Sequence, residues 1–404
     1  MKFKAISKKL NISKKFFVVI GFLLLAILST FVPKTFANAD NSNSQEAMQE
    51  ISSSVFDILD GVDLSQMEEL VSDIENTPIL QSSVREKIES ILRGEYFTNY
   101  TSLAPALLSL IFGDIRSVLP FVFSLIAIGL LCNLVTNLKS SNSNFSPIID
   151  FIFLSVTVLI VLVVFKNILS TTNKTINLIL TQMQIIFPIL ITLLGTIGSV
   201  SSISIYNPLV AVLTTGVTFV FDKLLYPIFI LVLILTILGH LTDTIKFDKI
   251  NGFLMSTFKW TIGIVFTLFT GFLSIQGISA GKFDSVSIKA TKFAMKSYIP
   301  IIGSYVSDGM DFFVLGATLV KNSIGLVGVL ILAGTILSPI IMIIIYKLAL
   351  QLSSGVMQVT GNSKISDFLG SVSKILVLPI VLIVGIAFMY IITICLIMCT
   401  ANVL

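Results

Sequence analysis

The stretch from Gly277 to Asp311 reads GISAGKFDSVSIKATKFAMKSYIPIIGSYVSDGMD and lies between long apolar runs. On a helix its four lysines fall within a sector of about 80°, and they are Lys282, Lys289, Lys292 and Lys296. A break is expected at Pro300–Gly303, and Asp308 and Asp311 follow it one helical turn apart. Such a basic stripe is typical of an interfacial helix whose lysines reach the lipid headgroups. The alternative is a functional element that faces a pore, a cavity or a partner.

The composition around this stretch is that of a membrane protein. Of the 404 residues, 55% are hydrophobic and 12% are charged, and the mean hydropathy is +0.99. A soluble domain carries about 25% charged residues, so lipid is the solvent for most of this chain. Because unpaired backbone groups are not tolerated in hydrocarbon, the apolar segments should be helices. The sequence therefore predicts an all-α, polytopic membrane protein.

Residues 1–39 have the pattern of a cleaved secretory signal peptide. They hold seven lysines and no acid, with a 16-residue apolar core from Phe16 to Phe31. Ala37 and Ala39 frame an A-x-A cleavage site. The alternative is an uncleaved signal anchor, because the core is close to the lower length limit of a span. In either case the chain from residue 40 onward begins outside the cytoplasm.

Residues 40–116 differ from the rest of the chain in charge. They carry 14 acidic and 4 basic residues, a net charge of −10, whereas residues 117–404 carry a net charge of +7. Apolar residues recur every three or four positions and are interrupted at Asn76-Thr77-Pro78. This spacing predicts two or three short amphipathic helices that form a small extracytoplasmic cap or a docking surface.

Residues 117–404 form the predicted multispan membrane domain. The expected spans are Val118–Thr136, Ile148–Phe165, Met183–Val200, Pro208–Phe221, Leu224–Leu241, Phe258–Ile278, Ser323–Leu352 and Ile375–Met398. Asp222 and Lys223 are expected to pair in a tight hairpin between two of these spans. The 30-residue run Ser323–Leu352 contains Pro339 and is too long for one untilted span. It is therefore either one kinked helix or two short ones.

A shift of 112 residues reveals an internal repeat of residues 148–259 and 260–371. Pro188 then falls on Pro300, and Pro227 falls on Pro339. Repeated units with interrupted helices are typical of secondary transporters, in which the interruptions mark the binding site. The matching segments here are Pro188–Gly198 and Pro300–Gly309.

The orientation of the basic stripe is left open by the sequence. With an extracytoplasmic start, six spans place Lys282–Lys296 outside, against the positive-inside tendency. Either a short upstream segment is re-entrant, or these lysines act on the far side of the membrane.

No catalytic or cofactor motif is present in the sequence. It contains no P-loop, GxSxG, HExxH or CxxC motif, and His240 is its single histidine. We expect no enzyme activity, no ATP hydrolysis by this chain, no cofactor, no metal site and no nucleic-acid partner. Charges within or beside apolar segments are the functional pointers, with Asp308 and Asp311 favoured as the polar lining of a cavity. The candidate pore or partner residues are Asp284, Lys289, Lys292, Lys296, Pro300, Gly303, Asp308 and Asp311.

The chain resembles a known family over essentially its whole length. The residues that carry the likeness are Gly277, Asp284, Lys292-Phe293-Ala294, Ile299-Pro300-Ile301-Ile302-Gly303, Ser307-Asp308, Phe187–Leu194 and Tyr206-Asn207-Pro208-Leu209. In these residues it resembles the stage III sporulation protein AE family of endospore-forming Firmicutes, whose members are likened to permeases. The resemblance supplies no substrate and no catalytic residue.

The resemblance implies a role in endospore formation. It implies a multi-pass subunit of the mother-cell (outer forespore) membrane that joins a forespore partner across the intermembrane space, in a channel with a separate ATPase subunit. The leading hypothesis is therefore a non-enzymatic subunit of a mother-cell-to-forespore channel or secretion complex, with membrane lipid, the other subunits and further copies of itself as partners. The alternatives are a stand-alone secondary transporter or permease of a small solute, and a membrane scaffold without a pore.

Overall fold

The computed structural model describes residues 55–74, 82–93, 103–138, 146–242, 246–298 and 303–400. All of them belong to one compact unit, residues 54–404. Every regular element within the described ranges is a helix, which confirms the predicted all-α class. The predicted signal peptide, with Ala37 and Ala39, lies outside these residues.

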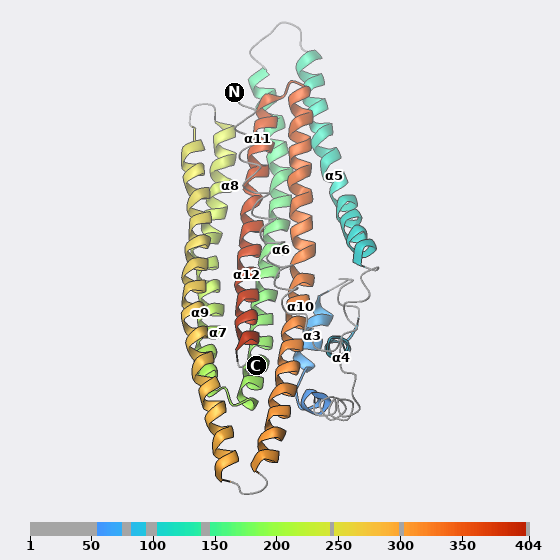
Figure 1. The fold of residues 1–404 in the computed structure, drawn as a ribbon. Coiled ribbons are helices and arrows are strands. Elements are labelled where there is room, and N and C mark those ends of the chain that lie inside the picture. Colours follow the sequence, from blue (N-terminus) through green and yellow to red (C-terminus); the bar gives the residue numbers. More distant parts are fainter. Residues whose placement is uncertain are drawn as a thin grey trace, which may run out of the picture. The chain divides into compact units, whose positions relative to one another are not determined.

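The membrane domain consists of long antiparallel helices (Figure 1). Six helical stretches within the described part are long and apolar enough to cross a membrane, which confirms the polytopic architecture. The elements are α5 (Leu103–Leu138), α6 (Ser146–Thr196), α7 (Val200–Val220), η5 (Phe221–Leu225), α8 (Tyr226–Leu241), α9 (Asp248–Tyr298), α10 (Gly303–Val359), α11 (Ser363–Ile375) and α12 (Val377–Cys399).

Two glycines in the left-handed region make the tightest turns between these helices. Gly198 has a φ of 87° between α6 and α7, and Gly361 has the same φ between α10 and α11. Glycine adopts this conformation without the steric cost of a Cβ atom and commonly ends a helix. The break predicted at Pro300–Gly303 is also present, because α9 ends at Tyr298 and α10 begins at Gly303.

Several predicted spans are joined in the structure, so their expected separation is wrong. Ile148–Phe165 and Met183–Val200 belong mostly to the single helix α6. Ser323–Leu352 lies within the single helix α10, which agrees with the first of its two expected alternatives. Pro188 and Pro339 lie inside α6 and α10 without ending them. A proline removes one backbone hydrogen bond, and packing against neighbouring helices offsets this loss.

The expected hairpin at Asp222 and Lys223 is wrong as well. Both residues are exposed in the π-helical turn η5, and α7, η5 and α8 form one continuous helical path from Val200 to Leu241. A π turn inserts a residue into a helix without reversing its direction. The 112-residue repeat stays a prediction. Under that shift the turn Ile197–Ser199 maps onto residues 309–311, which lie inside α10.

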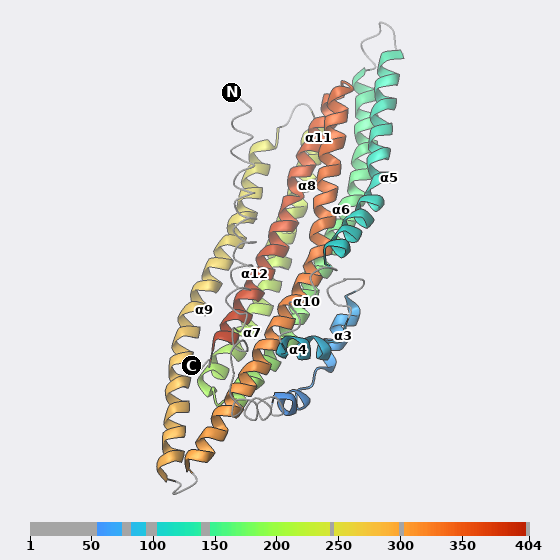
Figure 2. The same cartoon turned by 45° about the vertical axis from the view of Figure 1, so that its right-hand side comes forward.

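Helix α12 forms the core of the bundle. It lies between α9 and α10 in both views (Figures 1 and 2) and also contacts α6. Most of its side chains are buried on all sides, which explains why its sequence is apolar without helical periodicity. The ring of Tyr390 stacks on Phe187 of α6 with a centroid distance of 5.3 Å, and the Tyr390 hydroxyl donates to the Gly328 carbonyl of α10.

The N-terminal acidic segment packs on one end of this bundle. We use that name for residues 55–74 and 82–93, which contain a helix at residues 55–60, α3 (Ser65–Asp73) and α4 (Val84–Leu92). The amphipathic helices predicted here are therefore confirmed. Helix α3 contacts α6, and α4 contacts α10. We call the end of the bundle with this segment and the α6–α7 turn the acidic end.

The long helices exceed the thickness of a membrane. Helix α6 has 51 residues, and at 1.5 Å per residue it is about 75 Å long, against about 30 Å for the hydrocarbon layer. Large exposed apolar side chains are frequent on α5, on α6 between Ile148 and Val163, on α8 and on the first half of α9. The second half of α6 has none, because neighbouring helices and the acidic segment cover it.

Candidate functional site

The turn between α6 and α7 is held by a carboxylate from a third helix. Asp284 of α9 is buried, with 1% of its surface exposed. One of its oxygens accepts from the Ser201 amide at 2.9 Å, and the other accepts from the Ser202 amide at 3.1 Å and from the Ser202 hydroxyl. Amides in the first turn of a helix have no partner within that helix. Asp284 therefore caps α7, and its negative charge lies at the positive end of the α7 dipole.

The C-terminus of α12 is held at the same end by a buried cation. Lys321 of α10 is fully buried, and its Nζ donates to the carbonyl oxygens of Met398 at 3.1 Å and Thr400 at 2.5 Å. The last carbonyl groups of a helix have no partner within it, and a positive charge beside them is favourable. Lys321 thus caps α12 as Asp284 caps α7.

A buried tyrosine connects the two caps. Tyr206 lies one turn after Ser202 on α7, and its hydroxyl oxygen is 2.9 Å from the Thr400 hydroxyl oxygen. The carbonyl of Thr400 is one of the two that accept from Lys321. These five residues, Asp284, Ser202, Tyr206, Thr400 and Lys321, are called the polar cluster. The cluster links α7, α9, α10 and the end of α12.

The polar cluster is suited to hold helices in place. Its carboxylate and ammonium groups form hydrogen bonds with backbone groups at helix ends, and burial makes each of these hydrogen bonds costly to break. Within the described ranges, no group of three or more His, Cys, Asp or Glu side chains is placed to hold a metal ion. The cluster therefore fixes the relative positions of four helices at the acidic end.

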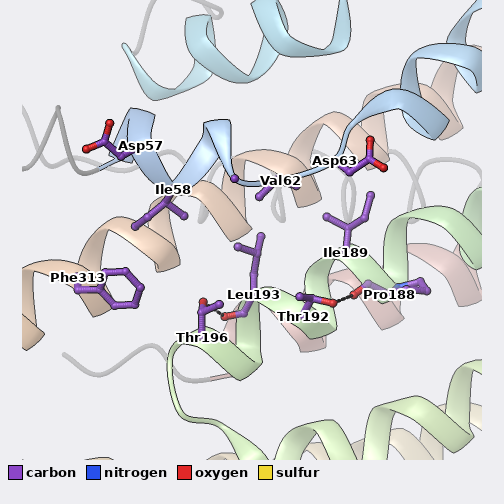
Figure 3. A pocket seen from close by; sticks show the side chains of 11 residues that line it. Asp57, Ile58, Val62, Asp63, Pro188, Ile189, Thr192, Leu193, Thr196 and Phe313 are labelled. Atoms are coloured by element: carbon purple, nitrogen blue, oxygen red, sulfur yellow. Dashed lines mark hydrogen bonds between the residues drawn. The ribbon is translucent and has the colours of Figure 1, made fainter.

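A pocket of about 590 Å³ lies between the acidic segment and α6 (Figure 3). Its floor is formed by α6 from Pro188 to Thr196, and Phe313 of α10 closes one side. Ile58 and Val62 cover it from the acidic segment. Asp57 and Asp63 lie at the rim, and their carboxylate groups point outward from the pocket. The pocket therefore combines an apolar interior with an acidic edge.

The acidic segment presents most of its charge to solvent. Residues 55–74 contain six acids and no base. Asp63 accepts from the amide and the hydroxyl of Ser65 at 3.0 and 2.6 Å, and these hydrogen bonds lower its pKa below the ordinary value of 3.8. Arg85 of α4 forms an ion pair with Asp60, and this pair joins the 55–60 helix to α4. Arg85 forms a second ion pair with Glu89 within α4.

One cation of this segment is directed inward. Lys87 of α4 has 2% of its surface exposed, and its ammonium group donates to the Ser82 carbonyl. Burial lowers the pKa of Lys87 from its ordinary value of 10.5. Acidic side chains therefore dominate the exposed surface of the segment, because Lys87 is buried.

The structure separates the candidate residues that the sequence predicts. Asp284 is buried in the α7 cap, whereas Lys289 and Asp311 are exposed on α9 and α10. Gly303 begins α10. Pro300 lies outside the described residues, as do the side chains of Lys292, Lys296 and Asp308. A pore-lining role for Asp308 and Asp311 stays a prediction.

The basic stripe is part of a longer helix, and the position of its lysines at the lipid headgroups stays a prediction. It is the last part of α9, which runs without a break from Asp248 to Tyr298. The helical conformation predicted for the stripe is thus confirmed, but the stripe is continuous with a membrane helix.

Sequence reasoning missed the other members of the polar cluster. Lys321 is a single lysine beside a long apolar run, which is a signal for a functional or structural charge. Ser202, Tyr206 and Thr400 carry no such signal, because hydroxyl groups are common in apolar helices. Their roles follow from contacts between residues far apart in the sequence.

Comparisons with known proteins match the chain over all of the membrane helices described above. The family model for stage III sporulation protein AE matches residues 82–401, from α4 to the end of α12. The chain belongs to the stage III sporulation protein AE family. A curated relative, stage III sporulation protein AE of Bacillus subtilis (strain 168), is 22% identical over 298 residues, or 73% of this chain and 75% of the relative. No solved structure matches the chain.

Only part of the pocket lining lies within the region that matches the stage III sporulation protein AE family. The pocket floor in α6 and Phe313 lie inside the matched region, whereas Asp57, Val62 and Asp63 precede it. All five residues of the polar cluster lie inside the match. The resemblance seen in the sequence is therefore confirmed at the level of the family.

Proposed function

We propose that this chain is a non-enzymatic membrane subunit of a channel or secretion complex that joins the mother cell to the forespore and is required for endospore formation. Its membership of a stage III sporulation family supports the sporulation role. Its six long apolar helices support a multi-pass position in the mother-cell membrane. Energy would come from a separate ATPase subunit, since the sequence has no P-loop.

The observation that carries this proposal is the acidic segment mounted on the bundle. Its buried apolar residues, such as Leu59, Met67 and Ile88, attach it to the helices, so its exposed acids are held in a fixed position. A charged surface held in this way selects oppositely charged partners and steers them to the site. We infer that other subunits of the complex dock on it.

A stand-alone transporter has less support. Its support is the predicted repeat, in which Pro188 matches Pro300. Helix α6 continues through Pro188, whereas α9 ends before Pro300 and α10 begins after it, so the two matching segments differ in structure. The charged groups of the polar cluster are bound to helix ends, so they do not converge on a solute site.

The test is to neutralise the docking surface without touching the pocket or the fold. Glu69 and Glu86 are exposed on α3 and α4, and replacing both with Gln should leave insertion and folding intact. Other subunits should then fail to co-purify with the chain from sporulating cells, and heat-resistant spores should be lost. The matched control replaces Asp222 and Asp367, which are exposed outside the segment, with Asn. Normal assembly of the Glu69→Gln, Glu86→Gln variant would contradict the docking role.

A further inference from the structure

An exposed strip on α9 combines apolar and basic side chains on one helix face. Val286 and Phe293 expose 69% and 73% of their surfaces, and the exposed Lys289 lies between them. Positions three and four residues apart lie on the same face of a helix. The surrounding residues 282–298 contain four lysines and one acid, and that acid, Asp284, is buried in the α7 cap. The strip therefore presents a net positive charge with two apolar side chains.

The pocket has the complementary character. Its interior is apolar, Asp57 and Asp63 lie at its rim, and residues 55–74 carry six acids and no base. Its volume of about 590 Å³ leaves room for an aromatic side chain from another molecule. Phe293 would meet apolar surface in it, and Lys289 would meet carboxylates.

The strip and the pocket lie at the same end of the bundle but on different sides. Asp284, which precedes the strip, binds the start of α7, and the pocket floor ends at Thr196, the last residue before the α6–α7 turn. Helix α9 lies on the left in both Figure 1 and Figure 2, whereas α3 and α4 lie on the right. One molecule cannot bring its own strip to its own pocket, but neighbouring molecules in one membrane can do so.

We propose that the α9 strip of one copy docks in the acidic pocket of a second copy, in a head-to-tail contact between chains of this protein. Because the two surfaces are different, the contact is heterologous, and each molecule keeps one free strip or pocket to bind the next. Repetition in the plane of the membrane would give a closed ring or an open row. A symmetric pairing of two strips is disfavoured, because it would bring their lysines together. This inference does not depend on the sporulation complex and goes beyond the proposed function.

The test compares full-length variants in detergent or nanodiscs by native mass spectrometry. The wild-type chain should form assemblies of several copies. Lys289→Glu should weaken them by at least about tenfold, because it sets a like charge against the acidic rim. The control Lys249→Glu changes an exposed lysine at the opposite end of the same helix and should leave the assemblies intact. Asp57→Lys should disrupt them from the pocket side.

A mixture of the two disruptive variants distinguishes a head-to-tail contact from other arrangements. The Lys289→Glu chain keeps an intact pocket, and the Asp57→Lys chain keeps an intact strip. Together they should form assemblies of several copies again, because the intact strip of one variant fits the intact pocket of the other, and the two reversed charges attract each other at the alternate contact. Failure of the mixture to assemble would contradict the head-to-tail contact. A monomeric wild type at all concentrations would overturn the proposal. Full assembly of the Lys289→Glu chain would also overturn it. If that chain assembles fully but no longer binds vesicles of anionic lipid, the strip is a lipid-binding surface instead.

Discussion

The carboxylate of Asp284 joins two parts of the chain that are 82 and 83 residues apart in sequence. A carboxylate in a buried site is stable as an anion only if donors surround it. Two amides and a hydroxyl at the start of α7 supply these donors. The same interaction satisfies amides at the start of α7 that would otherwise be buried without a partner. The α7 donors therefore stabilise the buried carboxylate, and the carboxylate stabilises the start of α7.

Removal of this carboxylate should destabilise the α6–α7 turn. Asp284→Ala leaves the Ser201 and Ser202 amides without an acceptor and should lower the free energy of unfolding by about 2–5 kcal/mol. Asp284→Asn keeps one acceptor oxygen and should cost less. Denaturant titration of the purified chain measures this, with hydrogen exchange of the two amides as a local readout. Asp367→Ala, on the exposed face of α11, is the control and should change stability by less than about 0.5 kcal/mol. Unchanged exchange at Ser201 and Ser202 in Asp284→Ala would contradict the cap.

At the scale of residues, the sequence identifies some of the charged groups that matter but not the groups to which they bind. It names Asp284 as one of the charges in the stretch Gly277–Asp311, but the partners of Asp284 on α7 cannot be read from spacing. The same holds for Lys321, whose acceptors are carbonyl groups that every residue possesses. The sequence instead favours Asp308 and Asp311, as the polar lining of a cavity. Composition shows that a charge is unusual in its place, but only the fold shows which helix end it meets.

At the scale of elements, hydropathy finds the helical segments but not their connections. Most of each predicted span is helical, yet α6 joins two of them and α7–η5–α8 joins another two. Polar residues at the centre of α6, including Lys166 and Lys174, look like a loop in a hydropathy profile. A long helix that leaves the lipid shows the same pattern. Gly198 and Gly361 mark two reversals of direction, but only their positive φ in the structure distinguishes them from the glycines inside helices.

The attachment of the acidic segment depends on one small residue of α10. A Cβ atom at Gly316 would lie 3.3 Å from Ile58 Cδ1 and 3.5 Å from Val55 Cγ2. Gly316→Leu should therefore displace the helix at residues 55–60 and cost about 1–3 kcal/mol of its docking. Hydrogen exchange should rise in residues 55–74 and stay low in α12.

Gly309→Leu is the matched control for this change. Gly309 is on the same helix, and a Cβ atom there would meet no atom within 4 Å. Both substitutions raise helix propensity by a similar amount, so the difference between them reports the contact with the acidic segment. Equal exchange in residues 55–74 of the two variants would show that this segment does not pack at Gly316.

At the scale of the whole molecule, exposed lysines divide the bundle into two layers. Lys174 stands 24 residues before Gly198, and Asp222 stands 24 residues after it, so antiparallel α6 and α7–α8 place them at a similar level. Lys166, Lys174 and Lys223 are all exposed near this level. Exposed charges are costly in hydrocarbon. The exposed apolar side chains of α5, of the first part of α6 and of α8 lie on the side of this level away from the acidic end, whereas α7 exposes Val200, Val212 and Phe219 on the acidic side.

This division predicts where the membrane lies. The hydrocarbon layer should surround α5, α8 and the first parts of α6 and α9, and the half with the polar cluster should project from it on the side of the acidic segment. Single cysteines can test this in a chain that lacks Cys132, Cys395 and Cys399, with an impermeant maleimide applied to intact and then to permeabilised cells. The sites are Asp57, Lys174, Phe151 and Lys249, all of them outside the buried core.

Asp57→Cys and Lys174→Cys should react from the same side of the membrane, because both lie on the acidic side of the lipid layer. Lys249→Cys, at the opposite end of α9, should react only from the other side. Phe151→Cys should react from neither, since its exposed side chain faces lipid. Reaction of Lys174→Cys together with Lys249→Cys would instead place the membrane around the polar cluster. The capped ends of α7 and α12 would then be buried in lipid, and the docking surfaces on α9 and α6 would be confined to the hydrocarbon layer.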